Sequence, residues 1–157
     1  MCLGPWLVLS RHAPPRVDAS AWREQARRFL AALVDAGDAA RVLTESDTLP
    51  VRVASLQTPD VVSRVSVHAS ALTSASHEKQ RADRAVRAID GAGFDALVSA
   101  AKSVWFIEVD PRDDSRAALV VAATLSMVLL GPIVPPGDDA IFGVKTARAR
   151  LEAAGWA

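Results

Sequence analysis

The sequence contains a single cysteine, Cys2, and this scarcity removes several kinds of site. One thiol can form neither an intramolecular disulfide nor a cysteine-based metal site. The first ten residues are apolar, but they carry no basic side chain and are interrupted by Gly4 and Pro5, so we expect no signal peptide. A chain without disulfides or an export signal fits a reducing compartment, and we predict that it is cytoplasmic.

The chain also lacks an excess of charge of either sign. It has 18 basic and 18 acidic side chains, and residues 1–78 and 79–157 are each balanced as well. Nucleic-acid binding by counterion release needs clustered positive charge, so we predict no nucleic-acid partner. A neutral surface gives little repulsion between copies, which leaves a homo-oligomer open.

Motifs that hold cofactors or build active sites are missing too. The three histidines, His12, His68 and His77, include no pair three or four residues apart, so no helical zinc motif exists. There is no Gly-Lys-Ser/Thr phosphate loop and no Gly-x-Ser-x-Gly turn that would present a nucleophilic serine. We therefore expect no cofactor. The absence of these motifs favours a protein that is not an enzyme, but it does not decide the question.

What is present is the composition of an ordinary globular domain. The 157 residues are 50% hydrophobic and 23% charged, which predicts a single domain over 1–157. Arginine outnumbers lysine fifteen to three, and asparagine and tyrosine are absent. Because the codons for lysine, asparagine and tyrosine are AT-rich, this bias indicates a GC-rich, bacterial genome.

Hydrophobic spacing predicts an α+β fold. Residues 6–11 are apolar on both sides, 61–70 alternate apolar and polar, and 103–109 are nearly continuous apolar, as expected of strands. A 3.6-residue stripe that includes Trp22 and Phe29 predicts a helix reaching to about residue 36. Further extended segments are expected at 42–45, 51–56 and 140–144, and further helices at 74–90, 94–101 and 146–154. We predict one mixed, largely antiparallel sheet with helices packed on it.

The segment at about 115–130 is apolar almost all round. Its apolar run covers fourteen residues, from 117 to 130, whereas a bilayer span needs ~20. We therefore predict a buried core helix and no membrane partner.

An acidic cluster follows the predicted strand at 103–109 and comprises Glu108, Asp110, Asp113 and Asp114. Ligands often bind where central strands end, and Mg²⁺ prefers carboxylate oxygens, so the cluster is a candidate metal site. Asp138 and Asp139 could add to it from another loop. Alternatively, Asp113 or Asp114 caps the helix that follows, since acid in a first turn complements the helix dipole. The spacing favours the cap.

Arginines gather on two predicted helices: Arg23, Arg27 and Arg28 on the first, and Arg84 and Arg87 on a later one. Trp156 lies at the end of the chain with little around it in the sequence. A tryptophan exposed beside arginine is typical of an interface hot spot, so these six residues are candidate protein-binding residues. A solvated helix face, and a Trp156 folded back onto the core, are the alternatives.

These observations favour a small bacterial protein-binding module that acts by stoichiometric binding, such as a toxin-neutralising immunity protein or an operon adaptor. One alternative is a metal-assisted hydrolase or transferase that uses the acidic cluster. Another is a structural subunit of a homo-oligomer, in which the apolar helix faces a copy of itself.

Overall fold

Among the residues that the structure describes, six strands form one sheet in which neighbouring strands are antiparallel. The computed structural model describes residues 4–37, 40–89, 93–137 and 140–156. Within them the strand order is β3-β5-β6-β7-β1-β8. The strands are β1 (Trp6–Ser10), β3 (Ala32–Asp35), β5 (Leu49–Ser55), β6 (Thr58–Ala71), β7 (Ser103–Val109) and β8 (Ile133–Val134). A separate two-stranded ladder pairs β2 (Arg16–Val17) with β4 (Arg41–Val42).

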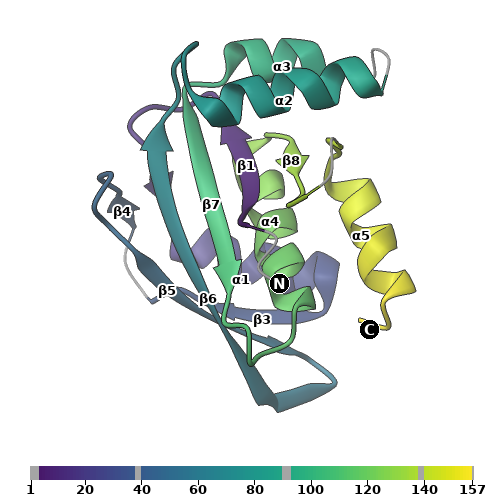
Figure 1. The fold of residues 1–157 in the computed structure, drawn as a ribbon. Helices are drawn as coiled ribbons and strands as arrows, with labels where there is room; N and C mark the ends of the chain where they lie inside the picture. Colours follow the sequence, from purple (N-terminus) through teal and green to yellow (C-terminus); the bar gives the residue numbers. More distant parts are fainter. Residues whose placement is uncertain (1–3, 38–39, 90–92, 138–139, 157) are drawn as a thin grey trace.

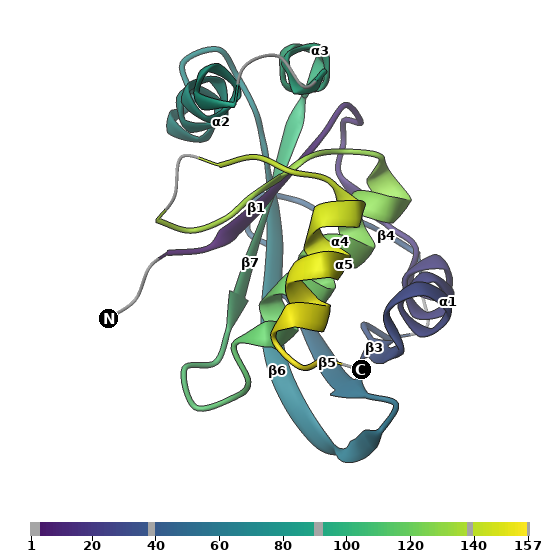
Figure 2. The same cartoon turned by 90° about the vertical axis from the view of Figure 1, so that its right-hand side faces the viewer.

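Helices pack on this sheet, so the predicted α+β fold is confirmed. The described part of the chain contains α1 (Ala19–Leu30), α2 (His77–Ala88), α3 (Phe94–Ala100), α4 (Arg116–Leu129) and α5 (Val144–Ala153). Figures 1 and 2 show α4 against the sheet with α1 and α5 beside it, while α2 and α3 lie together at one end of the molecule. The two groups of helices bury two separate hydrophobic clusters.

Strand β1 divides its side chains between these two clusters. Val8 packs in the cluster that contains α4, whereas Leu7 and Leu9 pack in the cluster that contains α2 and α3. Neighbouring side chains of a strand point to opposite faces of the sheet. A strand apolar on both sides is therefore covered on both sides, as its sequence predicts.

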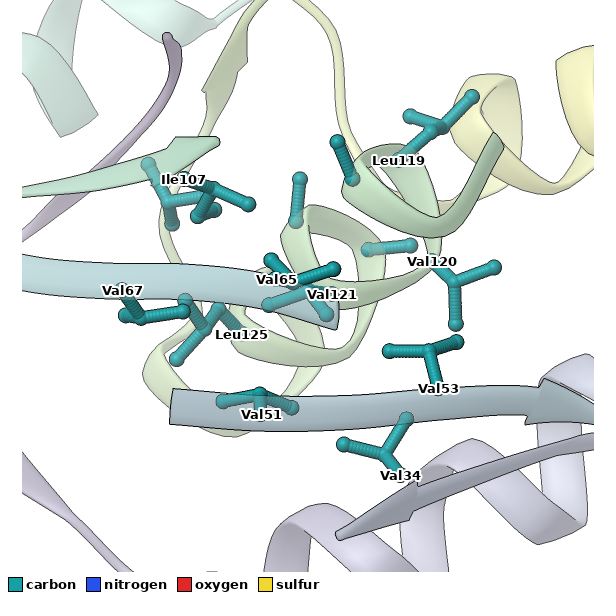
Figure 3. Close-up of a cluster of buried hydrophobic side chains, with 14 of the residues drawn as sticks. Val34, Val51, Val53, Val65, Val67, Ile107, Leu119, Val120, Val121 and Leu125 are labelled. Carbon is teal, nitrogen blue, oxygen red and sulfur yellow. The ribbon is translucent and has the colours of Figure 1, made fainter. Parts of the chain in front are cut away.

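Strand β6 follows its predicted alternation. Val65, Val67 and Ala69 are buried, whereas Arg64 and Ser66 are exposed. Figure 3 shows the buried valines of β5 and β6 meeting side chains of α4 such as Val121 and Leu125. The main core therefore lies between the sheet and α4.

Helix α4 is the buried apolar helix that the sequence predicts. Only Arg116, Met127 and Val128 of its residues are not buried. None of the helices in the described part of the chain combines the length and apolarity needed to cross a bilayer. Because most side chains of α4 are buried within this chain, the helix presents little surface to a second copy, and a contact of that helix with its copy stays a prediction.

The prediction of one helix reaching to residue 36 is also wrong. Helix α1 begins after Asp18, whose carboxylate accepts the backbone N–H groups of Ser20 and Ala21, and it ends at Leu30. Ala31 takes a left-handed conformation (φ 49°), and the chain then pairs with β5 as β3. The 140–144 segment contributes only a bridge between Phe142 and Ile133.

Candidate functional site

The C-terminal end of α1 presents a basic and aromatic surface. Arg27 and Arg28 are exposed, because the helix buries Ala26 and Leu30 on its other side. Phe29 is 41% exposed, and the guanidinium carbon of Arg28 lies 5.5 Å from its ring centroid. The sequence places Phe29 in the buried stripe, and the structure corrects this. Cations in a last helical turn are favourable beside the negative end of the helix dipole.

Trp156 folds back against this end of α1. Its indole N–H donates to the Leu30 carbonyl oxygen at 3.0 Å, and its backbone N–H donates to the Leu151 carbonyl at 2.9 Å. The guanidinium carbon of Arg116 lies 5.5 Å from the indole ring. Trp156 is only 6% exposed. The alternative in which it closes the core is therefore confirmed, and an exposed hot-spot tryptophan is not.

Helix α5 completes a shallow depression beside Trp156. The depression has a volume of about 170 Å³, and its charged lining residues are Arg27, Arg28, Arg148 and Glu152. Arg148 and Glu152 form an exposed ion pair at 3.4 Å. We call this surface, made by Arg27, Arg28, Phe29, Arg148 and Glu152 around Trp156, the α1–α5 face. It carries three guanidinium groups and one carboxylate, so it favours acidic partners.

The remaining candidate binding arginines lie elsewhere. Arg23 contacts the end of β3, 3.9 Å from Asp35, and does not line the depression. Arg84 and Arg87 are exposed on α2, and the Arg87 Nε donates to the Asp83 carbonyl at 3.3 Å. Figures 1 and 2 show α2 at one end of the molecule, well away from α1. The six residues therefore do not form one surface.

Sequence reasoning missed Arg148 because nothing near it in the chain marks it. It lies on α5, more than a hundred residues after Arg28, and it reaches the face only because α1 and α5 both pack beside α4. No local pattern reports that proximity. The exposure of Phe29 has a weak signal, since it lies at the border of the stripe, directly after two arginines.

In the acidic cluster, the aspartate carboxylates accept hydrogen bonds from N–H groups of the protein. Arg112 donates two side-chain hydrogen bonds to Asp110, at 3.2 and 3.1 Å, and these lower the pKa of that carboxyl from 3.8 to about 2. Arg116 donates to Asp114, which lowers the pKa of Asp114 as well. Asp113 accepts the backbone N–H of Arg64 at 2.8 Å. Each of these three aspartates thus accepts at least one hydrogen bond from an arginine of the same chain.

This arrangement gives no metal site among the residues that the structure describes, since no three acidic, histidine or cysteine side chains converge there. Glu108 is exposed on β7, in register with Ser66 of β6. Asp114 acts instead at the start of α4, where it accepts the backbone N–H of Arg116 at 3.0 Å. Asp138 and Asp139 lie outside the described residues.

In comparisons with known proteins, no family model, no curated protein and no solved structure matches this chain.

Proposed function

We propose that this chain is a protein-binding module and that its α1–α5 face contacts the partner. The observation that carries the proposal is the convergence of Arg27, Arg28 and Arg148 around an exposed Phe29 and a buried tryptophan. Arginine and aromatic side chains are the types that contribute most binding energy at protein interfaces. The module would act in the cytoplasm of a bacterium, by stoichiometric binding rather than turnover.

The charge of the face defines the partner's chemistry. Arginine binds carboxylates through two parallel N–H···O bonds, which gives both energy and orientation. Because Glu152 already pairs with Arg148, the two guanidinium groups of Arg27 and Arg28 are the ones left to meet a partner. An acidic protein surface that also carries an apolar residue for Phe29 fits this face.

Charge reversal on the two arginine-bearing helices tests the proposal. The variant Arg27→Glu/Arg28→Glu reverses two exposed charges at the α1–α5 face, and Arg84→Glu/Arg87→Glu makes the same change on α2. Each tagged full-length variant is returned to the source cell, and co-purifying proteins are quantified against wild type. We expect a stoichiometric partner with wild type and with the α2 variant, and at least a ~10-fold loss with the α1 variant.

Two results would contradict the proposal. The first is equal capture of the partner by both double variants. The second is a wild-type chain that is always recovered alone and that turns over a defined metabolite.

A further inference from the structure

The C-terminal end of α4 holds a leucine in a conformation that leucine rarely adopts. Leu130 has φ 56° and ψ 40°, the left-handed region in which glycine or asparagine usually ends a helix. Leu130 is 67% exposed. The next residue, Gly131, lies so close to β1 that a Cβ there would stand 1.6 Å from the Leu9 carbonyl oxygen. Close packing at Gly131 therefore holds Leu130 in place, although folding gains little from its side chain.

Leu130 forms one wall of an apolar groove. The groove has a volume of about 260 Å³, and Leu97, Ala96 and Ala100 of α3 form its opposite wall. Leu97 is 39% exposed. Figure 2 shows α3 lying beyond this end of α4. The groove therefore presents two branched aliphatic side chains to a partner.

The rim of the groove is basic. Arg11 is the only charged residue among its lining residues, and no ion pair engages it within the described part of the chain. Lys102 is exposed, and it lies beside Ser10, the neighbour of Arg11, because its backbone N–H donates to the Ser10 carbonyl oxygen at 2.8 Å. The acid on α3, Asp95, accepts the Ala96 backbone N–H at 2.9 Å. The groove thus favours an aliphatic side chain next to a carboxylate.

The same chain carries a segment of that chemistry. At the start of β6, Asp60, Val61 and Val62 are exposed in an extended conformation, Val61 to 65%. No ion pair within the described residues engages Asp60. The pairing of β6 with β7 stops at Val65 and Val109, so this stretch lies beyond the end of β7. Because alternate side chains of a strand share a side, Val62 lies on the same side as the unpaired carboxylate of Asp60, and this pair complements the unpaired guanidinium of Arg11 beside two exposed leucines.

Contact between the two regions within one chain is impossible. Figure 1 shows the β5–β6 hairpin at one end of the molecule and α3 at the other. Two copies that lie side by side and antiparallel bring each hairpin to the other's groove, and both contacts then close under one two-fold axis. Because the net charge of the chain is zero, electrostatic repulsion between the two copies is small.

We propose that the chain forms an antiparallel dimer in which the groove between Leu97 and Leu130 binds the 60–62 segment of a second copy, with Asp60 on Arg11. The α1–α5 face takes no part in this contact, so the dimer stands independently of the partner proposed above.

Charge reversal in two separate chains tests the dimer. Arg11→Asp makes the groove repel Asp60, and Asp60→Arg makes the segment repel Arg11, so each variant alone should dimerise at least ~10-fold more weakly than wild type in sedimentation velocity. An equimolar mixture of the two variants should dimerise like wild type, because the two altered sites attract one another and the two unaltered sites are native. Arg84→Asp lies on α2, which packs against α3 but does not line the groove, so it is the matched control for a nearby charge change and should dimerise normally.

Leu130→Gly separates binding from folding. Glycine adopts the left-handed conformation without strain, so the melting temperature of the monomer should not fall, while dimerisation weakens at least ~10-fold through loss of one wall of the groove.

Four outcomes would overturn the proposal: a wild-type chain that stays monomeric at every concentration, a mixture that associates no better than its components, a Leu130→Gly variant that dimerises normally, or assembly that grows beyond two copies. A monomer that instead binds an acidic, valine-rich peptide would assign the groove to another protein.

Discussion

The two ends of α4 are anchored in different ways. At its N-terminal end, aspartates accept backbone N–H groups of α4 and β6, and the arginine that opens the helix reaches the C-terminal tail by donating to the Ala154 carbonyl at 3.0 Å. At its C-terminal end, Gly131 packs directly on the backbone of β1. Hydrogen bonds at a partly exposed end can be replaced by water, whereas a steric fit between two backbones has no substitute. We therefore expect the two ends to respond very differently to substitution.

The largest effect is expected from Gly131→Ala. Its Cβ would meet the Leu9 carbonyl oxygen at 1.6 Å and the carbonyl carbon at 2.8 Å, so either α4 or β1 must move. We expect the free energy of unfolding to fall by ~4 kcal/mol, measured by chemical denaturation. Gly143→Ala is the matched control, because nothing lies within 4 Å of a Cβ there. Equal denaturation midpoints for the two variants would remove the steric argument.

A smaller effect is expected from Trp156→Phe, near the other end of α4. Phenylalanine keeps an aromatic ring beside Arg116 but loses the N–H that satisfies the Leu30 carbonyl. Leaving that buried acceptor unpaired should lower the free energy of unfolding by ~1–3 kcal/mol. Amide hydrogen exchange in the last turn of α1 should accelerate as well. Unchanged stability together with unchanged exchange would show that the tail does not hold α1.

Asp113→Ala should cost less again. It removes the acceptor of the Arg64 backbone N–H in a partly exposed place, and we expect a loss of ~1 kcal/mol in thermal unfolding. Asp113→Asn keeps an acceptor oxygen and should recover most of that loss. If asparagine were as damaging as alanine, the ion pair of Asp113 with Arg64 at 3.6 Å would be the more important contact.

The smallest effect concerns Asp110 and appears only in acid. Its pKa is about 2 in the folded chain, against an ordinary value of 3.8, because Arg112 stabilises the carboxylate. A carboxyl whose pKa is lowered by folding stabilises the folded chain at pH values above its ordinary pKa. This contribution is lost as the pH falls from about 3.8 to about 2. Unfolding curves of wild type and Asp110→Asn should therefore differ by a constant amount above this window and converge below it. A difference that stays the same throughout would contradict this origin.

Local patterns predicted the elements whose burial follows from their own sequence. In β6 the apolar residues Val65, Val67 and Ala69 alternate with polar ones, which predicts one buried side of the strand. Helix α4 is apolar on every side, which predicts burial all round. The segment after α1 was ambiguous, since Leu33 and Val34 fit the end of a helical stripe, whereas Ala32 and Val34 fit the buried side of a strand. Pairing with β5 decided for the strand.

The candidate surfaces were predicted only in part. Arg27 and Arg28 could be named because they lie off the stripe of α1, whereas Arg148 could not. The groove beside Leu130 escaped entirely, since a leucine at the end of an apolar helix gives no sign that it will be exposed. Exposure depends on what packs across from a residue, and sequence spacing does not contain that information.

The sequence by itself determined the class of fold and the burial of α4, because hydrophobic periodicity acts within ten or twenty neighbouring residues. Tertiary structure alone decided where α1 ends, that Trp156 caps it, and which charges meet at each surface. These outcomes depend on contacts between residues far apart in the chain, and such contacts form only when the whole core has closed around α4.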